Sequence, residues 1–200
     1  MGKKIIAVVG SYRKGHTIDS AVDEVLNSAK AAGVETEKIN LLDKHIEFCT
    51  NCRSCMQQIG VKRGECVIND EMKEILDKIE AADGIVLASP VNCYNVTAIM
   101  KRFIERLAPY GYWPWGANIP KFRIRNLTKN AVVITSSAAP AFIGRLFFPG
   151  TLNILKSSTR FIGCKIIKKI FIGLSAKQKD QPLTEKCKKQ LQTAGQLLAN

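Results

Sequence analysis

Apolar and polar residues follow two different patterns along this chain, and the two patterns alternate. Short apolar runs, most of them rich in β-branched residues, predict strands, and apolar positions three and four residues apart predict amphipathic helices between them. The predicted strands cover residues 5–9, 36–42, 84–89, 131–135 and 166–174. The predicted helices cover 18–32, 72–82, 96–108 and 183–198, with a further helical stretch to about 157 that Pro149-Gly150 must break or kink.

The alternation of strands and helices predicts an α/β fold built on a doubly wound, five-stranded parallel sheet. Right-handed crossovers place every strand-to-helix loop at the same edge of such a sheet. Three polar loops, at residues 10–17, 89–95 and 135–140, are therefore expected to converge. In the strand order 2-1-3-4-5, which this spacing suits, they meet at the switch point beside the first strand, where ligands bind. No repeat or low-complexity linker interrupts the pattern, so we expect one domain over residues 1–200.

The first of these loops has the chemistry of an anion site. A strand, a tight loop and a helix start, in that order, place backbone N–H groups and a helix N-terminus around a phosphate. The loop Ser11-Tyr12-Arg13-Lys14-Gly15-His16-Thr17 adds hydroxyl donors and two fixed positive charges. It matches neither G-x-G-x-x-G nor the Walker pattern, so the two commonest nucleotide motifs are excluded as written. An ordinary turn with solvated charges is the alternative.

Composition narrows the class of protein. The chain has 200 residues with 46% hydrophobic content, enough for one well-buried domain. It has no apolar window long enough to span a membrane, and its first apolar run is too short for a signal peptide, so we expect a cytoplasmic protein with no membrane partner. The only histidines are His16 and His45, and no G-x-S-x-G elbow is present, which argues against an imidazole metal centre and a hydrolase triad.

The net charge of +13 is concentrated in the second half of the chain. Residues 1–100 carry 12 Lys and Arg against 14 Asp and Glu, whereas residues 101–200 carry 18 against 3. A basic half suits nucleic acid, a membrane surface or acidic small molecules, or it is a solvated face. The aromatic and basic insertion at 109–128 either covers a bound ligand, contacts a second subunit, stacks bases or packs on itself. Because strands buried on both faces leave no sheet surface for bases, we expect no nucleic-acid partner.

Four cysteines form the sharpest local pattern, in a cysteine-rich loop at 48–67. Cys49, Cys52 and Cys55 are separated by two residues each, and Cys66 follows after ten more. A tight loop turns such thiolates toward one small centre, and a fourth thiolate completes the ligands of zinc or of a [4Fe–4S] cluster. Free or redox-active thiols are the alternative. The absence of a signal peptide argues against disulfides.

Several motifs in the correct order resemble those of flavodoxin-like NAD(P)H-dependent FMN reductases and iron-sulfur flavoproteins. Residues 10–17, GSYRKGHT, look like the GS-x-RK-x-GNT phosphate loop of that family. Residues 81–91 and 100–106 are similar to its AD-x-hydrophobic-SPVY and K-x-F-x-DR segments. The cysteine loop followed by Asn69-Asp70-Glu71-Met72 resembles the family's cysteine segment ahead of a DDM. The resemblance covers residues 3–107, with His16 and Asn92 standing where Asn and Tyr are usual.

The resemblance implies a flavodoxin-like, FMN-binding domain. The residues that would hold the FMN phosphate are Ser11, Arg13, Gly15, His16 and Thr17. Those that would wrap one edge of the isoalloxazine ring are Pro90, Val91, Asn92, Cys93, Tyr94 and Asn95, with backbone groups tuning the ring nitrogens. A third wall would come from Ser136, Ser137 and Ala138. The ligands of a [4Fe–4S] cluster would be Cys49, Cys52, Cys55 and Cys66, although the gap before the fourth cysteine is longer here than in the family's iron-sulfur members.

The activity implied is that of a cytoplasmic oxidoreductase. It would take hydride or electrons from NAD(P)H as co-substrate and pass them to a small oxidant or a protein acceptor, as a homo-oligomer (dimer or tetramer). Since flavin carries the redox chemistry, no catalytic side chain is expected. The alternative is a non-enzymatic electron carrier that holds FMN with or without a [4Fe–4S] cluster.

Overall fold

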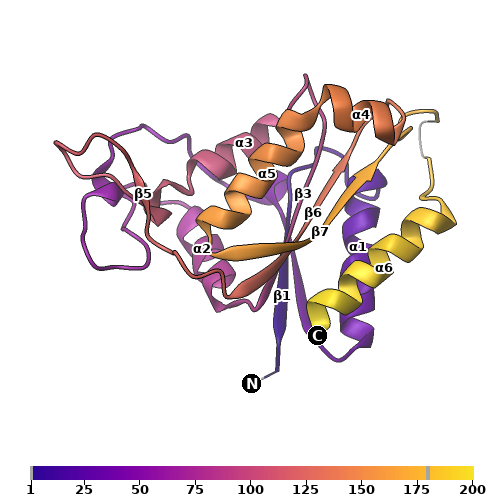
Figure 1. Ribbon diagram of the computed structural model, residues 1–200, viewed down its shortest axis with the longest axis horizontal. Helices are drawn as coiled ribbons and strands as arrows, with labels where there is room; N and C mark the ends of the chain where they lie inside the picture. Colours follow the sequence, from indigo (N-terminus) through magenta and orange to yellow (C-terminus); the bar gives the residue numbers. More distant parts are fainter. Residues whose placement is uncertain (1, 179–180) are drawn as a thin grey trace.

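Five parallel strands form the centre of the protein, in the order β2-β1-β3-β6-β7. The computed structural model describes residues 2–178 and 181–200. The strands of the sheet are β1 (Lys4–Val9), β2 (Glu35–Asn40), β3 (Gly84–Pro90), β6 (Lys129–Ser136) and β7 (Cys164–Ile172). Numbered by their appearance in this sheet, they run 2-1-3-4-5 (Figure 1). The predicted α/β fold class and strand order are therefore confirmed.

Helices cover both faces of the sheet (Figure 1). One face carries α1 (Thr17–Ala31) and α6 (Glu185–Ala199), and the other carries α2 (Met72–Ala81), α3 (Ala98–Glu105) and α5 (Pro149–Phe161). Successive residues of a strand point to opposite faces. In β1, Ile6 and Val8 accordingly join the core beneath α2 and α3, while the other apolar residues of the strand join the core beneath α1 and α6. Both cores hold the carboxyl ends of the strands in place.

The break expected at Pro149-Gly150 is confirmed, and Pro149 itself begins the second helix. The predicted helical stretch divides into α4 (Ala141–Phe147) and α5, with Pro149 at the first position of α5. Proline suits that position because its missing N–H would have no helical partner there. The predicted helix over 96–108 is shorter than expected, since α3 ends at Glu105 and a 3₁₀ turn, η3 (Ala108–Tyr110), follows.

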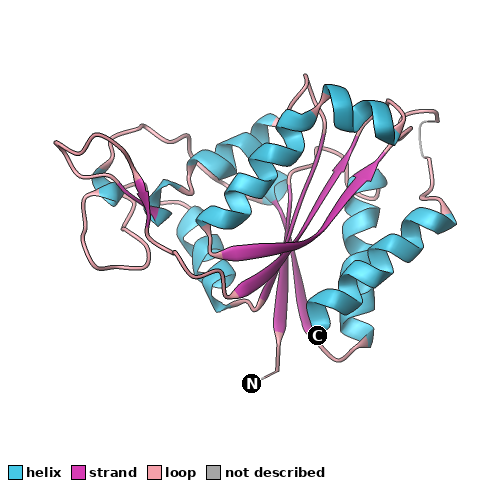
Figure 2. Ribbon diagram, viewed as in Figure 1, coloured by secondary structure: helices cyan, strands magenta, loops and turns pink. Residues whose placement is uncertain are grey.

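A lobe made mostly of loops lies beside the sheet (Figure 2). It contains the cysteine loop, which includes the 3₁₀ turn η2 (Ser54–Met56) and is preceded by the 3₁₀ turn η1 (Leu41–Asp43). It also contains the insertion at 109–128, which forms the two-residue strands β4 (Gly111–Tyr112) and β5 (Lys121–Phe122). The two segments lie side by side. Trp113 N–H donates to the Met56 carbonyl at 3.0 Å, and Gly64 N–H donates to the Pro109 carbonyl at 2.8 Å.

Within the described residues, 2–178 and 181–200, no helix is both long enough and apolar enough to cross a bilayer.

Candidate functional site

The three polar loops meet at the carboxyl edge of the sheet around a hollow of about 230 Å³. Ten of the residues predicted to bind the cofactor line it together. These ten are Ser11, Arg13, His16, Thr17, Pro90, Val91, Asn92, Ser136, Ser137 and Ala138. The sheet order explains the convergence, because β1, β3 and β6 are neighbours and each is followed by one of these loops.

The other predicted cofactor residues lie outside this lining. Gly15 turns the first loop with φ +73°, a conformation that favours glycine, while Cys93, Tyr94 and Asn95 lie beyond the wall. Four lining residues were not predicted: Tyr12, Ile18, Ser175 and Ala176. Tyr12 and Ile18 occur in segments already expected at this edge. Ser175 and Ala176 follow the last strand, where the sequence carries no motif.

Charged side chains and hydrogen bonds shape the first loop. Arg13 N–H donates to the Ser11 hydroxyl oxygen at 3.2 Å, which folds the loop back on itself. Arg13 Nη2 lies 2.8 Å from His16 Nδ1. Gly15 N–H donates to the buried carboxylate of Asp19 at 2.7 Å, and Lys38 Nζ lies 3.0 Å from the same carboxylate. Lys38 therefore offsets the negative charge of Asp19 beneath the loop.

The start of α1 supplies donors for an anion. The first N–H groups of a helix have no carbonyl partner within it, and the helix dipole adds positive potential at the same place. His16 is the N-cap of α1, but its side chain makes no capping hydrogen bond. Thr17, the first residue of the helix, lines the hollow beside Ser11 and Arg13. Backbone amides, two hydroxyls and a guanidinium thus surround one space, which is the donor set that a phosphate monoester requires.

A buried network ties the first loop to the second. Thr97 Oγ1 donates to the Gly10 carbonyl at 2.6 Å and accepts from Met100 N–H at 3.2 Å, so it caps α3 while holding the end of β1. Thr97 N–H in turn donates to the Ser89 hydroxyl at 3.1 Å. Gly10 is required here because a Cβ would lie 2.5 Å from the Met100 Cβ. The spacing of the two loops is therefore fixed by contacts with no exposure to water.

The second loop ends in a tight hairpin. Asn92 and Asn95 exchange backbone hydrogen bonds of 2.7 and 2.9 Å across a two-residue turn. Both turn residues have positive φ, 44° at Cys93 and 68° at Tyr94, where glycine or asparagine is usual. The Tyr94 side chain is 76% exposed and its ring lies 5.4 Å from that of Phe148. The turn is strained and exposed, and the lining of the hollow ends at Asn92, just before Cys93 and Tyr94.

Cys55 lies within electrostatic range of the other three cysteines of the loop. Burial, the largest cause, and negative charge on Cys66, Cys49 and Cys52 together raise the pKa of the Cys55 thiol to about 11. Hydrogen bonds with Ser54 and Thr50 lower the pKa of the exposed Cys52 thiol. The described residues contain no group of three His, Cys, Asp or Glu side chains arranged around a single ion. The donor set itself fits an iron-sulfur cluster, whose four irons each take one thiolate.

One arginine links the cysteine loop to the core. The Arg106 side chain is 2% exposed and lies at the end of α3. It donates to both carboxylate oxygens of Asp70, to the Glu47 carbonyl at 2.8 Å and to Cys66 Sγ at 3.6 Å. Burial opposes ionisation of Asp70, but the hydrogen bonds from Arg106 and from backbone N–H groups lower its pKa overall. Arg106 thus places a fixed positive charge against Cys66.

The insertion packs on the cysteine loop. The Arg123 guanidinium donates to the carbonyls of Pro109, Gly111 and Gln58, and also to that of Cys55 at 3.2 Å. The Arg53 guanidinium lies over two indole rings, 3.8 Å from the centroid of Trp113 and 4.4 Å from that of Trp115. None of the insertion's residues lines the hollow at the carboxyl edge. The insertion thus packs against the cysteine loop, and a role as a cover over a bound ligand stays a prediction.

Together, the sheet order and the phosphate-suited loop at its switch point define a flavodoxin-like α/β protein. The family model described as NADPH-dependent FMN reductase matches residues 3–124. That is more than half of the chain, and the chain belongs to this family.

Several curated relatives of this chain are named iron-sulfur flavoprotein. An iron-sulfur flavoprotein of Archaeoglobus fulgidus is 40% identical over 111 residues, which cover 56% of this chain and 48% of the relative. One of Methanocaldococcus jannaschii is 35% identical over 134 residues, covering 67% of this chain and 63% of the relative. The matched part of the chain therefore spans about half of the first relative and less than two thirds of the second.

Solved structures share the fold over nearly the whole chain. An FMN-dependent NADH-azoreductase of Bacillus anthracis, in complex with FMN, superposes with a TM-score of 0.71 at 16% identity, covering 99% of this chain and 100% of that one. A flavodoxin from the domain Archaea gives a TM-score of 0.56 at 13% identity, covering 98% of this chain and 96% of that one. At these identities the likeness defines the flavodoxin-like fold.

Proposed function

We propose that this protein is an FMN-dependent oxidoreductase that takes hydride or electrons from NAD(P)H and passes them to a small oxidant or a protein acceptor. The observation that carries the proposal is the convergence of ten predicted cofactor residues on one hollow at the start of α1. Membership of the FMN reductase family supports the choice of cofactor. When bound, FMN supplies the hydride and single-electron chemistry, which amino-acid side chains lack.

The first loop would hold the phosphate. Ser11 and Thr17 offer hydroxyl donors, the first turn of α1 offers backbone amides, and Arg13 offers a fixed charge at the rim. Charge-assisted hydrogen bonds of this kind are stronger than neutral ones. This donor set would distinguish FMN from riboflavin, which has no phosphate.

Two walls would flank the flavin ring. Val91 N–H donates to the Ser136 carbonyl at 2.8 Å, so the second and third loops are joined directly. Ser137 N–H donates to the Ile172 carbonyl at 2.9 Å, which ties the third loop to β7. Because both walls are fixed by backbone hydrogen bonds, they can orient a flat ring and exclude water from it with little rearrangement.

We further propose that Cys49, Cys52, Cys55 and Cys66 hold a [4Fe–4S] cluster. The four-thiol donor set, the charge of Arg106 against Cys66 and the relatives named iron-sulfur flavoprotein support it. Iron and acid-labile sulfide counted on anaerobically purified protein test it. About four irons per chain are expected. Zinc, or thiols that are fully titratable without any metal, would overturn it.

Anaerobic mixing with NADH or NADPH tests the enzymatic role. The proposal predicts rapid loss of the oxidised flavin absorption with at least one of the two nucleotides. Slow bleaching with both would favour the alternative, a non-enzymatic electron carrier. The basic second half of the chain favours NADPH by charge steering, so we expect faster bleaching with NADPH and a larger effect of salt on that rate.

The exposed face of α4 supports a homo-oligomer. Phe142, Leu146 and Phe147 are 74%, 73% and 66% exposed, and they are followed by Phe148, which contacts Tyr94 of the second loop. Apolar side chains gathered in this way are typical of protein contacts. We propose that a second copy of the chain covers them. Light scattering should show an assembly larger than one chain, and Phe147→Glu should dissociate it.

A further inference from the structure

A second hollow, separate from the proposed flavin site, opens between α3, α5 and the insertion. Its volume is about 480 Å³, within the range of small-molecule sites. It shares no lining residue with the hollow at the carboxyl edge. Its walls include the C-terminal halves of α3 and α5, whereas the proposed flavin site lies at the N-terminal end of α1.

The walls of this hollow are mainly apolar and aromatic. The apolar lining comprises Met56, Ile104, Leu107, Trp113, Phe122, Ile154 and Phe161. The rings of Phe122 and Phe161 meet edge to face with centroids 4.7 Å apart, and Phe122 remains 41% exposed. Rings arranged in this way favour a flat aromatic occupant, which gains both burial and ring contacts.

The polar groups at the rim carry an unbalanced positive charge. Lys101 is paired with Glu105 at 3.3 Å, and the two charges offset each other. Lys121 is exposed, and within the described part of the chain no carboxylate pairs with it. The neutral side chains of Asn51 and Ser157 complete the rim. An acidic group on a bound molecule would therefore pair with Lys121 at the opening of the apolar hollow.

We propose that this hollow binds a small aromatic molecule that carries one acidic group. Burial of the ring against the phenylalanine and isoleucine side chains would supply the affinity, and Lys121 would set the orientation. Asn51 and Met56 belong to the cysteine loop, so the occupant would touch the segment that carries Cys52 and Cys55. The proposal does not rest on FMN binding.

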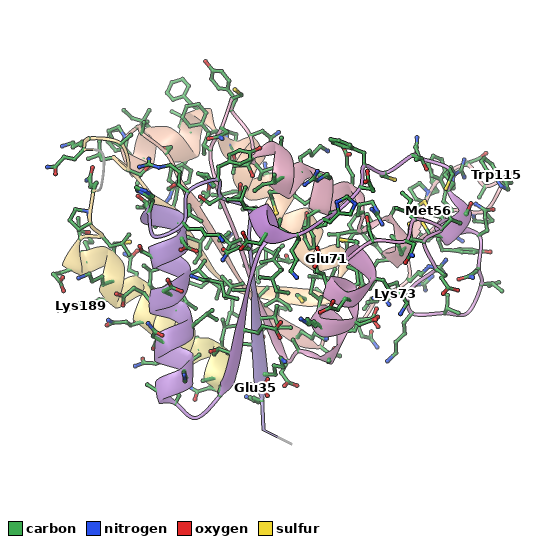
Figure 3. The ribbon with its side chains drawn as sticks, turned by 180° about the vertical axis from the view of Figure 1, so that it is seen from behind. Glu35, Met56, Glu71, Lys73, Trp115 and Lys189 are labelled. Atoms are coloured by element: carbon green, nitrogen blue, oxygen red, sulfur yellow. The ribbon has the colours of Figure 1, made fainter. Side chains whose placement is uncertain are left out.

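The chain offers matched variants to test this site. Ser157 is an exposed lining residue of α5, so Ser157→Phe would fill the hollow without disturbing the core, and Ser157→Ala would leave it open. Lys121→Gln removes the rim charge. Lys189→Gln removes the same charge from α6, at the other end of the molecule from Met56 and Trp115 (Figure 3).

Titration calorimetry with 2-naphthoate, on protein with and without saturating FMN, measures the binding. We expect one saturable site per chain in both states, a loss of at least about tenfold in affinity for Ser157→Phe, and little change for Ser157→Ala. Lys121→Gln should weaken binding about threefold, and Lys189→Gln should not. The neutral analogue 2-naphthylmethanol should bind more weakly than 2-naphthoate.

Three results would overturn the proposal. The first is that 2-naphthoate does not bind the wild type, and the second is that it binds Ser157→Phe as tightly as the wild type. The third is that binding disappears as the protein concentration rises, which would make this face a contact between copies of the chain. Equal affinity for 2-naphthoate and 2-naphthylmethanol would overturn the assignment of an acidic ligand. If FMN fails to bind while 2-naphthoate binds as expected, only the proposed flavin function fails.

Discussion

Arg106 and Asp70 form a two-pronged ion pair inside the protein, with Arg106 Nη1 and Nη2 at 2.6 and 3.1 Å from the two carboxylate oxygens. Both side chains are almost completely buried. The pair joins two segments that the sequence analysis identified separately, one following the cysteine loop and one ending α3. Because Arg106 also donates to Cys66, the same contact positions the fourth cysteine against the core.

Loss of the Asp70 charge should destabilise the whole protein. Asp70→Asn would leave the Arg106 guanidinium buried without a counter-charge, which costs about 3–5 kcal/mol. Urea unfolding of the metal-free protein measures the change. Glu105→Gln is the control, because Glu105 pairs with Lys101 at the surface and its loss costs less than about 1 kcal/mol. Equal effects of the two substitutions would contradict this account.

Thr97 is expected to couple stability to FMN affinity. Thr97→Val keeps the shape of the side chain but removes the 2.6 Å hydrogen bond to the Gly10 carbonyl, which keeps only the 3.4 Å one from Ser89, and the acceptor for Met100 N–H, at a cost of about 1–3 kcal/mol. Because Gly10 precedes the phosphate loop, FMN should also bind more weakly. Thr97→Ser, which retains the hydroxyl, should restore both. If Thr97→Val bound FMN like the wild type, the network would not govern the loop.

Arg123 is expected to protect Cys55. Arg123→Ala removes the donor that holds the Cys55 and Gln58 carbonyls, so the cysteine loop should separate from the insertion. Cys55 is 7% exposed in the intact protein. Alkylation of the metal-free, reduced protein, followed by peptide mass spectrometry, should show faster modification of Cys55 in this variant. Arg125→Ala, at an exposed position of the same segment, is the control and should leave the rate unchanged.

Glu37 should make stability depend on pH. Partial burial opposes ionisation of Glu37, but hydrogen bonds from Lys78 at 2.9 Å and Lys4 at 3.1 Å lower its pKa overall. A lowered pKa in the folded state adds stability above the ordinary pKa of a glutamate, and this stability is lost as the pH falls through the folded value. Glu37→Gln should therefore be less stable than the wild type by up to about 1 kcal/mol near neutral pH. The difference should shrink as the pH falls through the lowered pKa of Glu37 in the folded state, and a difference that stays constant with pH would contradict this account.

The sheet and its loops could be predicted because the signals are local. Apolar runs such as Ile5 to Val9 identify buried strands, and the handedness of crossovers then places the loops. The boundaries moved by one to three residues in several elements. The separation of α4 from α5 was also predicted, from Pro149, but the sequence did not show that Pro149 itself begins α5.

The lobe could not be predicted because its contacts are distant in sequence. Arg53 and Trp113, or Arg123 and Cys55, are some sixty residues apart or more, and no periodic pattern connects them. The positive φ angles of Asn51, Arg53, Cys93 and Tyr94 could likewise not be predicted, because none of these residues is a glycine. Tertiary contacts impose these conformations, so they appear only when the chain is folded.

Comparison of FMN with riboflavin tests the central claim most directly. Fluorescence titration of flavin-free protein should show FMN binding about a hundredfold more tightly than riboflavin, since the two differ by the phosphate that the start of α1 would hold. Ser11→Ala should weaken FMN binding and leave riboflavin binding unchanged. Equal affinities for the two flavins, or no FMN binding at all, would contradict the account.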